Sequence, residues 1–232
     1  MSDTSVLERD RAYMLLLDQI LSGELGADQA LSERKLADNL QMGRTPVREA
    51  IRRMTREGLI EVRPARGTYV RELTIDEVEE IYEARIGLEG MAAFLAAERG
   101  PTEAFATFRQ KFEDMIAKPE DFDLADTHKL GQEFHVEIFR AAKNRYLIEI
   151  YEPLRLRHRI TLGLPRFYNH DWVRESVKEH LAILDAIVRR ESTEARQLIC
   201  DHLIKGLDVR SKIFDQLAAA HAPGLKQKVA GQ

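Results

Sequence analysis

The stretch of sequence that decides the fold of the N-terminal part covers residues 44–54 and reads RTPVREAIRRM. Pro46 is tolerated in a helix only within the first turn, where its missing N–H would have no partner, so a helix is expected to start near Arg44. The helix would carry an apolar stripe on one side and an arginine at every fourth position on another. The two sets are Val47, Ala50, Ile51 and Met54, and Arg44, Arg48, Arg52 and Arg56. One side therefore packs, and another is cationic.

Short elements flank this helix on both sides. Ser32 is placed to cap a two-turn helix that ends near Leu40, and two β-prone runs at 58–63 and 67–71 are joined by a turn. Residues 6–22 have the periodicity of an amphipathic helix. Its predicted apolar stripe is Leu7, Met14, Leu17, Ile20 and Leu21. Helix, short helix, cationic helix and hairpin together predict a winged helix-turn-helix.

The charge distribution agrees with this prediction although the whole chain has a net charge of -4. Residues 43–71 hold eight arginines against three glutamates, which is the electrostatic footprint of a DNA-binding element. Arg44, Thr45 and Arg48 occupy the start of the expected recognition helix, from which side chains reach base edges. Arg34 and the hairpin tip at Arg66 and Gly67 are placed to contact the DNA backbone or the minor groove. A row of arginines on an isolated helix could simply be a solvated face. Here the surrounding helices and hairpin favour a role in DNA binding.

The rest of the chain is helical in periodicity. Thr74 and Glu77 have the spacing of a capping box, and a helix is expected to run from there to about Glu98. Further helices are predicted over 102–117, 122–142, 145–162, 172–190 and 193–217, which suggests an antiparallel bundle. The fold class is thus mainly α, with a winged helix-turn-helix over 1–72 and an all-helical domain over 73–220. A flexible tail is expected over 221–232.

Several classes of protein are excluded by composition. The single cysteine, Cys200, rules out a disulfide framework and a cysteine-based zinc finger. The chain has no apolar run long enough to span a membrane and no secretion signal, so it is expected in the cytoplasm.

Charged and titratable residues on apolar helical faces mark a candidate effector site. Arg85 and Glu89 fall on the apolar stripe of their helix, where they could pair with each other or Arg85 could hold a ligand carboxylate. His135, His180 and His202 lie on the apolar faces of three different helices. Each alone is more often a hydrogen-bonded core histidine, but three that converge in a bundle would make a divalent-metal site. The run from Arg155 to Arg159 is typical of a solvated face, from which one arginine could turn into a pocket.

At this point the chain resembles the GntR family of bacterial transcriptional regulators. The motifs in the first domain are LSERKLA at 31–37, RTPVREAI at 44–51, EGLI at 57–60 and RGTYV at 66–70. The resemblance implies DNA contacts by Arg34, Arg44, Arg48 and Gly67, and a homodimer that reads a palindromic double-stranded operator. Gly43 departs from the family, which usually has Ser or Thr at this helix cap.

The second domain resembles the helical effector domain of the FadR-type subfamily. Its motifs are YEARIGLE at 82–89, FHVEI at 134–138, AAKN at 141–144 and EHLAILDAI at 179–187. The resemblance implies a metal held by three histidines and one acidic residue or asparagine, with a small carboxylic acid bound beside it. His135, His180 and His202 match the histidines, and Arg85, Glu89 and Asn144 are the candidate effector contacts.

One position departs from that metal site. The acidic ligand is expected four residues before His135, where this chain has Gly131. His128 lies too far along the helix to replace it, about 10 Å from His135 along the axis. Zinc, nickel and manganese all suit three histidines plus oxygen.

Two alternatives to the metal-bound acid stay open. The same regulator could lack the metal and bind an apolar or acyl-type effector in the bundle. The histidines could instead belong to a helical metalloenzyme and activate water, although no general base is paired with them and the arginine-faced helix would have no role. The predicted function is a ligand-responsive repressor or activator, not an enzyme.

Overall fold

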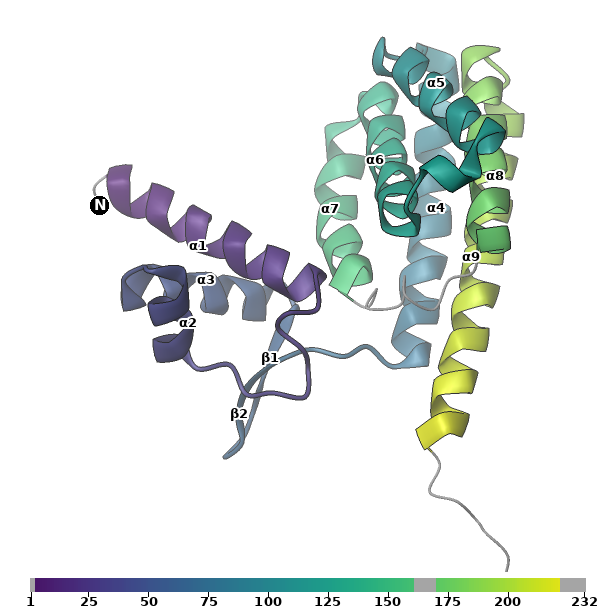
Figure 1. The fold of residues 1–232 in the computed structure, drawn as a ribbon. Helices are drawn as coiled ribbons and strands as arrows, with labels where there is room; N and C mark the ends of the chain where they lie inside the picture. The colour runs from purple at the N-terminus through teal and green to yellow at the C-terminus, as the bar shows by residue number, and fades with distance from the viewer. Residues whose placement is uncertain (1–2, 161–169, 222–232) are drawn as a thin grey trace, which may run out of the picture.

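The computed structural model describes residues 3–160 and 170–221 and divides into a small winged head and a larger helical bundle (Figure 1). The head contains α1 (Asp3–Leu21), α2 (Glu33–Leu40), α3 (Arg44–Arg56), β1 (Ile60–Arg63) and β2 (Gly67–Val70). Its apolar core draws side chains from all five elements, Leu16 of α1 and Met54 of α3 among them. The fold class, mainly α with an N-terminal winged helix-turn-helix, is as predicted.

The local signals in the head act as expected. Ser32 accepts a hydrogen bond from the Lys35 N–H and so caps α2, while Gly43 caps α3 through its extended backbone alone. The predicted stripe of α3 is buried, with Val47 and Met54 fully enclosed. The strands pair antiparallel, with Ile60 opposite Val70 and Arg63 opposite Gly67, which makes the wing.

The predicted apolar stripe of α1 is wrong in part. Leu7 and Met14 are 68% and 62% exposed, whereas Tyr13 and Leu16 are buried. The buried face is rotated because the Tyr13 hydroxyl donates a hydrogen bond to the Glu57 carboxylate at the end of α3. A tertiary contact therefore selects which face of α1 turns inward.

The bundle is built around α4 (Ile75–Arg99), which packs against α6, α7, α8 and α9 (Figure 1). The capping box at Thr74 and Glu77 is formed in both directions. The other elements are α5 (Ala104–Ala117), the 3₁₀ turn η1 (Pro119–Asp121), α6 (Leu124–Ala142), α7 (Arg145–Ile160), α8 (His170–Val188) and α9 (Ser192–His221). The predicted helices are all present, and their described ends lie within a few residues of the expected ones; the end predicted at residue 162 lies outside the described residues.

Two expectations concern the chain ends and membranes. Helix α9 continues to His221, and the flexible tail predicted over 221–232 otherwise lies outside the described residues. None of the helices in the described ranges is long and apolar enough to cross a membrane.

Helix α7 is the bundle helix that meets the head (Figure 1). It contacts α1, and Leu156 packs against the core of the head. The same helix contacts α4 and α6 within the bundle. Helix α7 thus packs against both the head and the rest of the bundle.

Candidate effector cavity and DNA-contact face

A cavity of about 60 Å³ lies inside the bundle and is walled by α4, α6, α7, α8 and α9. Its lining is strongly basic: it includes four arginines and five histidines, and among the described lining residues there is no aspartate or glutamate. These residues are Arg85, Arg155, Arg159, Arg210, His128, His135, His158, His180 and His202. Such a wall suits an anion of a few heavy atoms.

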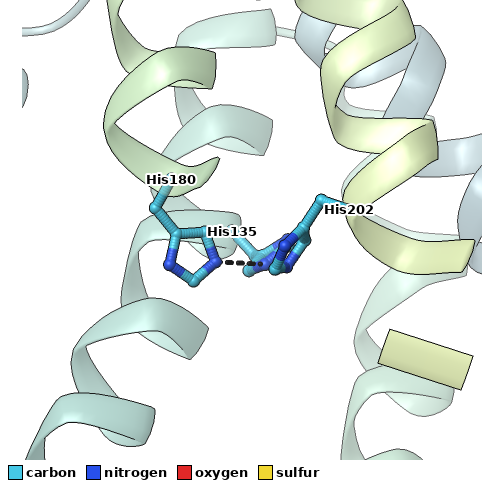
Figure 2. A group of neighbouring side chains, drawn as sticks. All are labelled: His135, His180 and His202. Carbon is cyan, nitrogen blue, oxygen red and sulfur yellow. Dashed lines mark hydrogen bonds between the residues drawn. The ribbon is translucent and has the colours of Figure 1, made fainter. Parts of the chain in front are cut away.

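Three of the histidines that line this cavity form a compact cluster, which Figure 2 shows. His135 comes from α6, His180 from α8 and His202 from α9, and one ring nitrogen of each lies within 4.8 Å of the others. The Nε2 atoms of His135 and His180 are 3.2 Å apart. The three residues that the sequence placed on separate inner faces are therefore brought together.

Two carboxylates orient these rings from behind. The Nδ1–H of His135 donates to Glu89, and the Nδ1–H of His202 donates to Glu179 over 2.8 Å. Each of these bonds leaves Nε2 as the nitrogen that carries a lone pair. An outer carboxylate that fixes a histidine tautomer in this way is a regular companion of metal-ligating imidazole.

His180 is held by packing. Its ring stacks on Phe112 with 5.5 Å between ring centroids and meets the edge of Phe134. Its Nδ1 is buried and makes no hydrogen bond with the residues that the structure describes. The nitrogen that faces His135 is the other one, Nε2, so packing against the two phenylalanines, and no outer hydrogen bond among the described residues, sets the orientation of this ring.

The protonation states favour metal binding. Burial lowers the pKa of His180 well below the ordinary value and the neighbouring imidazoles lower it further. Burial also lowers the pKa of His202, against the hydrogen bond to Glu179, which raises it. Both rings therefore stay neutral near pH 7, as ligands must.

Gly131 occupies the position where the resemblance implied an acidic ligand. A Cβ built there would lie 2.6 Å from Cε1 of His180, closer than side chains approach one another. The His180 ring thus fills the space that a side chain at 131 would need. The residues fit a divalent ion through three histidines, with oxygen from water or an effector in place of the carboxylate.

Arg85 and Glu89 form an ion pair with each other, which was one of the two arrangements expected from the sequence. Arg85 donates from Nε to Glu89 over 2.6 Å, and its Nη1 faces Nε2 of His158 at 2.9 Å. Burial opposes the charge on Glu89, but attraction to Arg85 and His135 outweighs it and lowers the pKa of Glu89 to about 2. Arg85 also lines the cavity, so it is fixed by Glu89 while it faces a ligand.

Two candidate effector contacts lie elsewhere. Glu89 is not part of the cavity wall and instead binds Arg85 and His135 from behind. The Asn144 side chain accepts hydrogen bonds from the N–H groups of Tyr146 and Leu147, over 3.1 and 3.3 Å. It therefore caps the start of α7, outside the cavity, because a short polar side chain before a helix satisfies its first donors.

The sequence interpretation missed part of the cavity wall. Arg155, His158 and Arg159 of α7 all line it, where the run was expected to be a solvated face from which at most one arginine turned into a pocket. Arg210 and His128 also contribute. A signal existed for Arg210, which lies eight residues after His202 and four after Gly206 and so shares their helical face.

All six candidate DNA contacts are exposed on the head: Arg34, Arg44, Thr45, Arg48, Arg66 and Gly67. Arg34 lies 3.9 Å from the Asp38 carboxylate, and on α3 the neighbouring Arg52 is paired with Glu49 and Arg53 with Glu57. Gly67 has a φ of +119°, a conformation that favours glycine at the tip of the wing. The structure thus presents these side chains on the surface from which a recognition helix and a wing would reach a duplex.

Comparison with known proteins gives the family. Residues 8–70 match the bacterial regulatory proteins of the gntR family, and residues 80–205 match the FCD domain. The chain belongs to the GntR family. It is 27% identical to the Nta operon transcriptional regulator of Aminobacter aminovorans over 184 residues, which cover 78% of this chain and 83% of that protein. It is 26% identical to the HTH-type transcriptional repressor GlaR of Escherichia coli, covering 85% of this chain and 93% of GlaR.

A solved structure shows the same fold. The protein described as E. coli McbR/YncC superimposes with a TM-score of 0.76 and 23% identity, over 92% of this chain and all of that one. As a GntR-family member with an FCD domain, the chain is a ligand-responsive transcriptional regulator. Members of this family regulate transcription and are not enzymes, so the metalloenzyme alternative is set aside.

Proposed function

We propose that the bundle cavity binds a small organic acid together with a divalent metal ion, and that this binding changes the affinity of a homodimer for a palindromic operator. The observation that carries the proposal is a wall in which three converging histidines stand beside four arginines, with no carboxylate among the described lining residues. The protein would act in the bacterial cytoplasm, where its operator is.

The metal part rests on His135, His180 and His202. Their Nε2 lone pairs are available because outer carboxylates hold two of the rings and packing holds the third. A bound divalent ion would supply a Lewis-acid anchor for a carboxylate oxygen. Zinc, nickel and manganese are the candidates, since three imidazoles with oxygen donors do not discriminate sharply among them.

The acid part rests on the arginines. Arg85 is fixed by Glu89, and Arg159 and Arg155 approach from α7. A carboxylate can accept paired hydrogen bonds from such guanidinium groups. An apolar or acyl-type effector fits this wall poorly, because it would strip water from charged groups and return no hydrogen bonds.

The DNA part assigns roles to the exposed residues of the head. Arg44, Thr45 and Arg48 would read base edges in the major groove, while Arg34, Arg66 and Gly67 would hold the backbone or the adjacent minor groove. The relative that is named a transcriptional repressor favours repression for this chain.

The experiment starts with elemental analysis of untagged protein, followed by a thermal-shift screen of small carboxylic acids with and without zinc, nickel and manganese. We expect the unfolding temperature to rise with metal and to rise further with one class of acid. His180→Ala should abolish the metal response, and His170→Ala is the control because His170 is an exposed histidine on the same helix. A metal response that survives His180→Ala would refute the site.

Operator binding is tested separately. A duplex selected from random DNA by the purified protein is titrated by fluorescence anisotropy with and without the acid that stabilises most. Unchanged operator affinity at saturating acid and metal would contradict the coupling.

A further inference from the structure

Helix α7 has a proline inside it that divides the helix into two parts. Pro153 cannot donate a backbone hydrogen bond to the carbonyl of Glu149, and its ring crowds that turn. The N-terminal part is anchored in the bundle by Tyr151, which stacks on Phe139 with 4.0 Å between ring centroids. The part that follows, residues 154–160, is joined to it by a weakened turn, at which helices bend.

This second part carries cavity residues and head contacts on opposite faces. Arg155, His158 and Arg159 line the cavity. Leu156 and Arg157 fall on the other side of the helix, as a period of 3.6 residues requires, and Leu156 packs against the core of the head. Any ligand that binds the cavity side must therefore act on the same two turns that touch the head.

Arg157 makes the polar contact to the recognition helix. Its Nε donates to the backbone carbonyl of Glu57 over 2.9 Å, across 100 positions in the sequence. Glu57 is the C-cap residue of α3, so the guanidinium lies at the helix end where the exposed carbonyls concentrate negative charge. The contact holds α3 by its last turn and leaves its first turn, with the exposed Arg44 and Arg48, open to DNA.

Gly58 makes this contact possible. A Cβ at this position would lie 3.1 Å from Nε of Arg157, and the residue has a φ of +74°. A side chain at 58 would thus be strained and would press on the guanidinium. The turn after α3 is shaped so that Arg157 can approach it.

We propose that residues 154–160 form a hinged coupling segment, and that Arg157 is the positioning residue through which the occupied cavity sets the orientation of the recognition helix. The coupling rests on the proposed function, since it assumes an effector in the cavity and an operator on the head. A head held in one orientation loses less freedom on binding DNA, so the contact strengthens operator binding. By reciprocity, bound DNA strengthens the contact.

The first test needs no effector and no variant. The probe is the duplex selected from random DNA, and the readout is amide hydrogen exchange of the full-length protein with and without it. Exchange in peptides covering 154–160 should slow by about tenfold on DNA binding, the factor expected for one hydrogen bond from a charged donor. Exchange at 154–160 that is identical with and without DNA would overturn the proposal.

The second test uses Arg157→Gln, with Arg145→Gln as the matched control. Arg145 is an exposed arginine at the start of the same helix and contacts only its neighbour Tyr146 among the described residues. Arg157→Gln should bind the duplex about tenfold more weakly and lose the slower exchange at 154–160, while Arg145→Gln behaves as wild type. A purely structural role would lower the unfolding temperature and leave the DNA-dependent exchange in place. Arg157→Lys keeps the positive charge and replaces the glutamine variant if that variant does not fold. If exchange at 154–160 still slows fully in Arg157→Lys, the charge at this helix end is sufficient for the coupling. If the slowing is lost, the guanidinium group itself is required.

The hinge is tested with Pro153→Ala, which restores the missing backbone donor. The DNA-dependent slowing of exchange should then spread from 154–160 into residues 145–152, whereas in wild type it should stop at the proline. Slowing that already extends through the whole of α7 in wild type would show that Pro153 is no hinge. If the wild-type protein selects no DNA sequence, operator binding itself fails, which is a different result from DNA binding that leaves α7 unchanged.

Discussion

Gly131→Ala tests how tightly His180 is held. The new Cβ would meet Cε1 of His180 at 2.6 Å, whereas ordinary contacts begin at 3.4 Å, so the ring would have to move by about 0.8 Å. The ring packs against both Phe112 and Phe134, which also contact each other, so a shift of the ring alters its contacts with this aromatic cluster. Overpacking of this kind costs about 1–3 kcal/mol.

The control for this variant is Gly87→Ala. Gly87 is also inside a helix, and a Cβ there would meet nothing within 4 Å. Replacing it should stabilise the protein by up to about 1 kcal/mol through helix propensity alone. The difference between the two variants therefore isolates the contact with His180.

The assay is urea unfolding of both variants after metal removal, followed by nickel titration. We expect Gly131→Ala to be less stable than Gly87→Ala by about 1–3 kcal/mol and to bind nickel more weakly, because the displaced ring no longer aims Nε2 at the other two histidines. Equal stability together with equal nickel affinity would refute the argument that close packing at Gly131 fixes His180.

Three further predictions concern the buried charges and the head. Glu89→Gln should destabilise the protein by about 3–5 kcal/mol in urea unfolding, because it leaves the buried Arg85 charge without its partner. Wild type should lose the contribution of this pair as the pH falls from about 4.5, the pKa of Glu89 in the unfolded chain, through about 2, its pKa in the folded protein. A loss of stability centred near neutral pH would contradict the assignment to Glu89. Burial lowers the pKa of His128 to about 3, so the unfolded chain takes up a proton at this residue first, and His128 should contribute a loss of stability of up to about 1.4 kcal/mol per pH unit as the pH falls below about 6.5. The lowered pKa values of His180 and His202 add to the same slope, so His128→Gln should reduce the slope without abolishing it, and an unchanged slope would exclude His128 as a contributor. Arg44→Ala or Arg48→Ala should reduce discrimination between the selected duplex and one altered at a guanine by about 1–3 kcal/mol, measured by anisotropy at fixed salt, and undiminished discrimination would remove that residue from base reading.

Local chemistry made much of the fold predictable from sequence. The position of Pro46, the cap at Ser32 and the capping box at Thr74 each depend on a few neighbouring residues, and all three elements begin where these signals place them. Helical periodicity placed the three histidines on the inner faces of their helices, but that they converge follows only from how the three helices pack.

Contacts between distant segments were harder to predict. The buried face of α1 depends on the hydrogen bond between Tyr13 and Glu57, which periodicity within α1 does not contain. Arg155 and Arg159 were expected to face solvent because a run of charges usually does, yet α7 turns them toward a polar cavity. A basic interior wall and a solvated face have the same spacing in sequence, and only the packing of α7 against its neighbours distinguishes them.

The glycine at 131 also changes the charge balance of the cavity. Three imidazoles contribute no negative charge, and the carboxylates behind them are already engaged, Glu89 by Arg85 and Glu179 by Lys205 over 2.7 Å. The described wall adds arginines and no carboxylate. Arg85 and Arg155 are already paired with carboxylates that lie outside the wall, Glu89 and Glu152. The negative charge that balances a divalent ion should then come from the effector. In a site with its own acidic ligand a metal could be held before the acid arrives, whereas here metal and acid should each strengthen the binding of the other.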